Sequence, residues 1–95
     1  MKFYNRGIAA HLTAAIELLD DDHLVFQNFC GVGPIDLIRL NKNTGEVELY
    51  DVKTDNDKFH RPRERSELQI KLGVKNYYVN LHKRTKRVDG KVEKL

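Results

Sequence analysis

Two acidic residues and a lysine, Asp36, Asp51 and Lys53, are the side chains whose types and spacing best suit chemistry. Asp51 and Lys53 are two residues apart, so in a β-strand both point to the same face. Carboxylate oxygens bind hard divalent cations, and an ammonium group beside them can stabilise an anionic transition state or orient a water molecule. This combination suits phosphodiester hydrolysis. A second D-x-K triplet at residues 89–91 shows that the triplet alone would more often be an exposed charged pair.

The residues around these side chains predict a β-hairpin. Residues 35–40 are rich in aliphatic and β-branched side chains, and residues 46–52 alternate polar and apolar side chains. Between them, residues 41–45 supply Asn, Thr and Gly, which turn easily. The start of the first strand and the end of the second meet at one end of an antiparallel ribbon. The two carboxylates and the lysine should therefore converge there.

These residues resemble the signature of the PD-(D/E)xK nuclease superfamily. Pro34 and Asp36 match its P-x-D variant, and Asp51, Val52 and Lys53 match its D-x-K. The pattern is most similar to junction-resolvase-like nucleases and to small stand-alone nucleases of phages. The resemblance implies an α/β (α+β) fold with a restriction-endonuclease-like αβββαβ core, in which two helices flank a mixed central sheet.

The resemblance also implies a metal site. Asp36, Asp51 and the backbone carbonyl of Val52 would hold Mg²⁺ or Mn²⁺, and Lys53 would orient or activate the attacking water. A further ligand would come from the first helix.

The first helix is expected at residues 6–19, with Asn5 as a candidate N-cap. Helical spacing places an apolar stripe on one side. The stripe consists of Ile8, Leu12, Ala15, Ile16 and Leu19.

His11 is the candidate ligand on this helix. In the junction-resolvase branch, a metal-binding Glu follows four residues after a Gly that is preceded by a basic residue. Here Arg6 and Gly7 match, but the fourth position is His11. Glu17 is the other candidate, yet helix geometry directs it to solvent. Ligation by His11 would favour Mn²⁺ over Mg²⁺; the alternatives are a structural histidine or a site that has lost its ligand.

The remaining elements follow from local signals. Residues 23–29 predict a strand before the hairpin, and residues 74–81 predict one after it, reached through a helical crossover. Ser66 can cap the crossover helix and Gly73 can end it. We assign residues 1–82 to the nuclease core and residues 83–95 to a basic tail, which is either a minor hairpin turning at residues 89–90 or a disordered arm.

Basic side chains gather in the second part of the chain. Acidic residues outnumber basic ones in residues 1–57, and the reverse holds for residues 58–95. This asymmetry indicates a cation-binding half joined to a phosphate-binding half. Phe59 and His60 lie among arginines, as suits phosphate contact and base stacking, although a solvated loop explains them equally well. The candidate nucleic-acid-binding residues are Arg61, Arg63, Arg65, Gln69, Lys71, Lys83, Arg84, Lys86 and Arg87.

The size and composition of the chain limit the domain number, the cellular setting and the kinds of partner that we expect. A chain of 95 residues forms one small domain of marginal stability, which a homodimer would help. The single Cys30 excludes an internal disulfide and fits a cytoplasmic setting. No apolar run has the length of a membrane span, and the first residues lack the pattern of a signal peptide. We therefore expect no membrane contact, and a phage origin stays open.

The expected function is a metal-dependent DNA endonuclease that selects branched DNA such as a Holliday junction. A chain this short has little room for a domain that reads a long sequence. The alternatives are a sequence-tolerant nicking or homing-type nuclease, and a non-catalytic nucleic-acid-binding module that keeps the nuclease fold.

Overall fold

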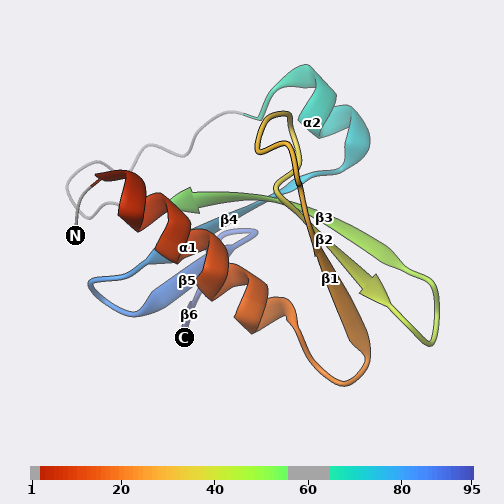
Figure 1. Cartoon of the computed structure of the whole chain (residues 1–95), viewed down its shortest axis with the longest axis horizontal. Coiled ribbons are helices and arrows are strands. Elements are labelled where there is room, and N and C mark those ends of the chain that lie inside the picture. Colours follow the sequence, from red (N-terminus) through yellow and green to blue (C-terminus); the bar gives the residue numbers. More distant parts are fainter. Residues whose placement is uncertain (1–2, 56–64) are drawn as a thin grey trace.

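The computed structural model describes residues 3–55 and 65–95 and contains two helices and a mixed sheet (Figure 1). The first six elements follow the predicted order, helix, three strands, helix, strand, and two more strands complete the chain. Their bounds are α1 Phe3–Leu18, β1 His23–Gln27, β2 Leu37–Asn41, β3 Val47–Thr54, α2 Glu67–Leu72, β4 Lys75–Asn80, β5 Thr85–Val88 and β6 Lys91–Lys94.

The six strands form one sheet in the order β1-β2-β3-β4-β5-β6. Every neighbouring pair is antiparallel except β3 and β4, which are parallel and are joined by the crossover that contains α2. A parallel pair requires such a crossover, whereas the antiparallel pairs need only turns. The predicted mixed α+β architecture is thus confirmed.

The predicted hairpin is formed by β2 and β3, and its turn closes on Asn41. The backbone N–H of Gly45 donates to the carbonyl of Asn41 at 2.8 Å, and the Asn41 side chain accepts from the backbone of Asn43 and Thr44. Gly45 has a φ of 75°, which a residue without Cβ adopts at little cost. The turn sets the register that places Leu37 opposite Tyr50.

The face that α1 buries differs from the prediction. Ala10, Ala14 and Leu18 are buried against the sheet, whereas most of the predicted stripe is exposed, with Ile16 71% exposed. Small alanines allow the helix backbone to come close to the strands, which large side chains would prevent. The exposed members of the predicted stripe are Ile8, Leu12, Ile16 and Leu19.

The start of α1 also differs from the prediction. The helix begins at Phe3, so Asn5 lies inside it and cannot be its N-cap. The core between α1 and the sheet is built from buried side chains of α1, β2, β3 and β4, among them Tyr50 and Tyr77, whose rings meet edge to face. Tyr77 and Tyr78 point to opposite faces of β4, as predicted: Tyr77 is buried and Tyr78 is half-buried.

The short helix α2 has the predicted caps at both ends. Ser66 accepts a hydrogen bond from the Gln69 backbone, and the Gln69 side chain accepts one from the Ser66 backbone, which completes a capping box. Gly73 ends the helix in the left-handed conformation. No residue of α2 is buried, so its position depends on these caps and on polar contacts.

The basic tail forms the predicted minor hairpin rather than a disordered arm. Strands β5 and β6 pair around Asp89 and Gly90, both of which have positive φ. Strand β5 also pairs with β4, so the tail extends the central sheet. In the part of the chain that the structure describes, no helix has both the length and the apolar character needed to cross a membrane.

Candidate metal and phosphodiester site

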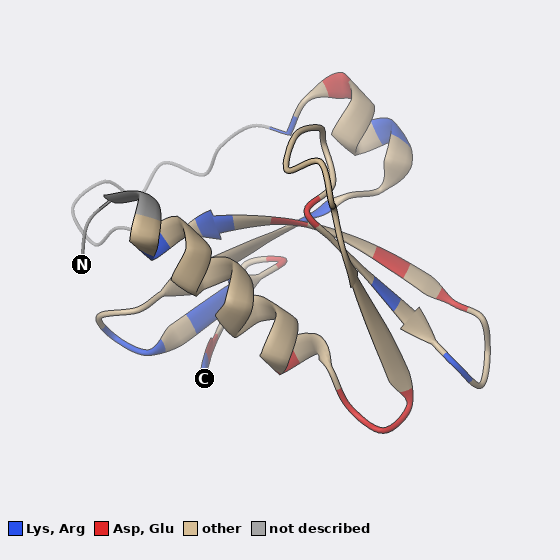
Figure 2. Cartoon of the chain, viewed as in Figure 1, with Lys and Arg blue, Asp and Glu red and all other residues tan. Residues whose placement is uncertain are grey.

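The structure brings the three predicted side chains together where β2 begins and β3 nears its end. Acidic and basic segments adjoin on β3 in Figure 2. The Asp36 and Asp51 carboxyl groups lie within hydrogen-bonding reach of each other. Lys53 Nζ lies 3.3 Å from Asp51 Oδ1. The two carboxylates are mostly removed from solvent, with side-chain exposures of 19% for Asp36 and 10% for Asp51.

Backbone hydrogen bonds fix Asp36 at this position. Its side-chain Oδ2 accepts the backbone N–H of Val52 at 2.7 Å, and its own N–H donates to the carbonyl of Tyr50 at 2.8 Å. Both contacts come from β3, so the carboxylate that precedes β2 is attached to the strand that carries Asp51. The Val52 N–H takes part in this attachment, and the role of its carbonyl as a ligand stays a prediction.

Gln69 of α2 holds Asp51 from the other side. Its Nε2 donates to Asp51 Oδ2 at 3.0 Å and to the carbonyl of Pro34 at 3.1 Å. One amide group therefore links the crossover helix, the end of β3 and the loop before β2. Gln69 was expected to bind nucleic acid, and the structure places it in direct contact with a carboxylate.

His11 reaches the cluster from α1. Its Nε2 lies 3.7 Å from Asp36 Oδ2, and its side chain is partly exposed. A hollow of about 300 Å³ adjoins His11 and is also lined by Gly7, Leu12 and Gln27. Glu17, the other candidate on this helix, instead pairs with Lys86 of β5 at 3.7 Å. The structure thus brings the imidazole beside Asp36 and Glu17 to another part of the sheet.

The surroundings of Asp36 favour its neutral form. Burial raises the pKa of the Asp36 carboxyl, and a hydrogen bond with Asp51 raises this pKa further. The hydrogen bond from the Val52 N–H and the electrostatic interaction with His11 both lower the pKa of Asp36. A divalent cation between the carboxylates would offset the repulsion between their negative charges.

The carboxylates of Asp36 and Asp51 suit a cation whose other ligands are water and substrate oxygens. Among residues 3–55 and 65–95, no three or more His, Cys, Asp and Glu side chains gather into a group that could hold a metal ion. Asp51 already contacts Lys53 and Gln69, but each carboxylate oxygen has two lone pairs. Mg²⁺ commonly binds through one or two carboxylates, with water and substrate phosphate completing its shell.

The loop that leads to Asp36 is organised by Asn28, which the sequence reasoning missed. Its Nδ2 donates to the carbonyls of Val32 and Ile35, and its Oδ1 accepts from the Cys30 backbone. Its own N–H donates to the Asp36 carbonyl at 2.9 Å. An Asn near the end of the predicted strand, followed by Phe29, Cys30 and Gly31, was the available signal, because Asn side chains commonly bond to backbone groups in turns.

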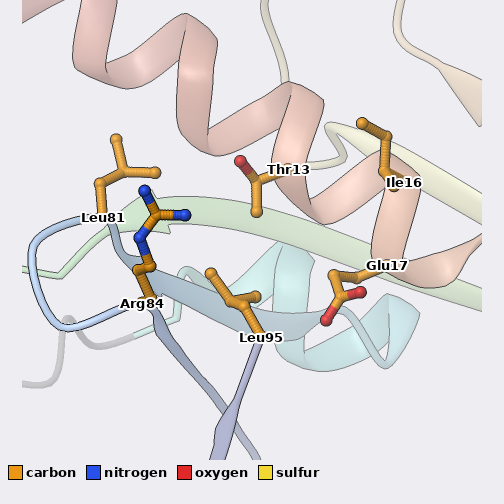
Figure 3. Close-up of a pocket in the computed structure, with 6 residues that line it drawn as sticks. All are labelled: Thr13, Ile16, Glu17, Leu81, Arg84 and Leu95. Atoms are coloured by element: carbon orange, nitrogen blue, oxygen red, sulfur yellow. The ribbon is translucent and has the colours of Figure 1, made fainter.

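The basic side chains predicted to bind nucleic acid lie in several places. Arg65 donates to the carbonyl of Val74 at 3.0 Å, and Arg87 stacks on Tyr78. Lys71 and Lys83 are exposed, on α2 and on the turn after β4. Arg84 lines a hollow of about 470 Å³ beside α1, together with Thr13 and Glu17 of that helix (Figure 3). Arg61 and Arg63, with Phe59 and His60, lie outside the described residues.

Comparisons with models of protein families, with curated proteins and with solved structures find no match to this chain.

Proposed function

We propose that this protein is a divalent-metal-dependent DNA endonuclease whose active site is the cluster of Asp36, Asp51 and Lys53. The observation that carries the proposal is the contact between two largely buried carboxyl groups with a lysine ammonium 3.3 Å from one of them. Burying two acids side by side costs stability, and such an arrangement is typical of sites that bind a cation or transfer protons. The motif resemblance and the strand order support a restriction-endonuclease-like core.

Asp36 and Asp51 would hold the cation, and the Val52 carbonyl and the His11 imidazole are the further ligands that we assign. When bound, Mg²⁺ or Mn²⁺ supplies positive charge against the charge that develops on the phosphate. The attachment of Asp36 to the Val52 N–H and of Asp51 to Gln69 keeps the two carboxylates in place before substrate arrives. This preorganisation lowers the cost of assembling the site.

Lys53 is assigned to the attacking water. Its ammonium group lies beside Asp51 on the same face of β3, which is where a water near the carboxylates would meet it. It can donate a hydrogen bond to that water and add positive charge near the phosphate. His11 is partly exposed and lies on the Asp36 side, where it orients that carboxylate or joins the ligand set.

We assign branched DNA as the substrate, cut by a homodimer. The concentration of basic residues after residue 57 supports a protein that contacts backbone phosphates. The exposed apolar side chains of α1 support self-association, because such groups are rarely left together in solvent.

Cleavage assays test the proposal. The full chain is incubated with a four-way junction, a linear duplex and a single strand, each with Mg²⁺, Mn²⁺ or EDTA. We expect metal-dependent cutting that is fastest on the junction and that Asp51→Asn lowers by at least about 10²-fold while the fold is retained. Equal cutting by Asp51→Asn, or cutting in EDTA, would contradict the assignment of the site.

A second candidate is a nucleic-acid-binding module without catalysis. The observation that favours it is that His11, Asp36 and Asp51 do not gather into a three-ligand metal group. Tight DNA binding with no cutting in either metal would favour this module over the enzyme.

A further inference from the structure

A row of side chains leads from the candidate active site across the sheet. Lys53 of β3 pairs with Tyr78 of β4, and Tyr78 pairs with Arg87 of β5. Directly paired residues on neighbouring strands point to the same face, so this row shares the face of Asp51. Strands are about 4.8 Å apart, which places Tyr78 one strand and Arg87 two strands from Lys53.

Arg87 and Tyr78 form a flat, positively charged surface. The Arg87 guanidinium carbon lies 4.5 Å from the centre of the Tyr78 ring, which is the distance of a cation–π contact. Asp55, with an oxygen 3.9 Å from Arg87 Nη2, also lies beside the guanidinium. Stacking holds the guanidinium in one orientation while its edge N–H groups can still donate to a phosphate.

Tyr78 and Arg87 line a hollow of about 340 Å³. Among the described residues that line it, two are arginines and one is an aspartate, and Asp55 lies beside Arg87 outside this lining. Its lining residues are Arg65, Asn76, Tyr78, Arg87, Asp89 and Gly90. The Arg65 guanidinium donates to the backbone of Val74, which holds it at the rim. The hollow lies within the size range of small-ligand sites.

We infer that this hollow binds one unpaired nucleotide of the DNA strand that is cut, with its base against the Tyr78–Arg87 stack and its phosphate beside Arg65 and Arg87. A flat aromatic and guanidinium surface suits a nucleobase, and two arginines suit a phosphate. The row Lys53, Tyr78, Arg87 joins the hollow to the active site over a distance that one or two nucleotides span.

This inference rests on the proposed function, because it takes the strand at Asp51 to be DNA. It deepens that function by naming what the enzyme recognises in a branched substrate. A base that stays stacked in a duplex cannot enter a concave pocket, whereas a base at a branch point or in a single-stranded arm can. The preference for branches is therefore expected to depend on the base and not only on charge.

The test compares two DNA probes that bear equal charge. Both are the same labelled duplex with a single-stranded arm, and in one probe the arm consists of abasic nucleotides. Binding to the full chain is measured in EDTA by fluorescence anisotropy. Stacking of one base contributes about 1–3 kcal/mol, so we expect the arm with bases to bind about 5- to 150-fold more tightly than the abasic arm. Equal affinity for the two probes would overturn the inference without any variant.

Variants then assign the effect to residues. Tyr78→Leu keeps apolar bulk and should abolish the preference, while Tyr78→Phe keeps the ring and should retain it. Arg87→Gln should weaken binding of both probes, because it removes a phosphate contact as well as the stack. Lys42→Ala, on the turn between β2 and β3, removes the same charge elsewhere and should leave the preference unchanged. A preference that survives in Tyr78→Leu would also overturn the inference.

The outcome distinguishes this nucleotide-binding subsite, the hollow lined by Tyr78 and Arg87, from the nuclease activity. A preference for bases that Tyr78→Leu abolishes, in a protein that never cuts DNA, would support the subsite and reject the enzyme. Metal-dependent cutting with no preference for bases would support the enzyme and reject the subsite.

Discussion

The Asp36 carboxylate accepts the backbone N–H of Val52 at 2.7 Å, so the acid that precedes β2 is fixed to the strand that carries Asp51. The same oxygen lies 3.7 Å from His11 Nε2, which joins α1 to this contact. Because Gln69 holds Asp51 from α2, elements far apart in the sequence converge on one carboxylate pair. The pair lies largely out of solvent, with side-chain exposures of 19% and 10%.

Removal of one acid should stabilise the metal-free protein. Burial and Asp51 raise the pKa of Asp36 above its value in the unfolded chain, so the folded state favours the neutral acid. This stabilising contribution is complete at low pH and is lost as the pH rises through the raised pKa. We expect Asp36→Asn to have a higher Tm than the wild type in EDTA at pH 7 to 8, with the difference disappearing at acid pH.

Thermal unfolding followed by circular dichroism from pH 3 to 8 measures this difference, and Asp21→Asn on the exposed turn after α1 is the control. Added Mn²⁺ should reverse the order, because only the wild type gains from binding. A lower Tm for Asp36→Asn in EDTA at neutral pH would show that the pair is not strained.

Lys53→Met should separate cleavage from metal binding. Lys53 contacts Asp51 but is not a ligand, so its removal should lower the cleavage rate by about 10²- to 10⁴-fold, as expected for a group that positions or activates water. Mn²⁺ affinity should be equal or higher, since a competing positive charge is lost. Single-turnover cleavage and Mn²⁺ titration measure the two effects. A rate within a few-fold of wild type would exclude Lys53 from the chemistry.

His11→Glu should change the preferred metal. A carboxylate in place of imidazole makes the ligand set harder and should raise the ratio of Mg²⁺- to Mn²⁺-supported cleavage. Glu17→Gln, which alters the other candidate of α1, should leave the ratio unchanged because Glu17 contacts Lys86. An unchanged ratio in His11→Glu would leave His11 with a structural role only.

Gln69→Ala tests whether the crossover helix supports Asp51. The substitution removes the half of the capping box made by the Gln69 side chain and the hydrogen bond to Asp51, whereas Ser66→Ala removes only the other half of the capping box. We expect both variants to lose about 1 kcal/mol of stability, and only Gln69→Ala to lose about tenfold in cleavage rate. Urea unfolding and cleavage assays give the two values. Equal rates for the two variants would limit Gln69 to a role in the fold.

The parts of the fold that were predicted correctly carry their signals in nearby residues. The turn at Asn41 to Gly45 and the caps at Ser66 and Gly73 depend on side chains that bond within a few positions. The convergence of Asp36 and Asp51 follows from the antiparallel hairpin alone. Such features do not require knowledge of distant packing.

The buried face of α1 could not be predicted in the same way. Leu12 and Ile16 suggest a core stripe by hydrophobicity, yet Ala10 and Ala14 are buried because the helix lies close to β3 and β4. How closely a helix approaches a sheet depends on the size of residues from several elements together. Likewise, the contact of Gln69 with Asp51 depends on where the crossover places α2, which no local pattern specifies.

The most direct test of the account is the binding of Mn²⁺ to the full chain, measured by electron paramagnetic resonance titration with Asp36→Asn, Asp51→Asn and the control Asp21→Asn. We predict one Mn²⁺ per chain in the wild type and in Asp21→Asn, and at least about tenfold weaker binding in Asp36→Asn and in Asp51→Asn. Mn²⁺ affinity that is the same in all four proteins would contradict a shared cation at Asp36 and Asp51.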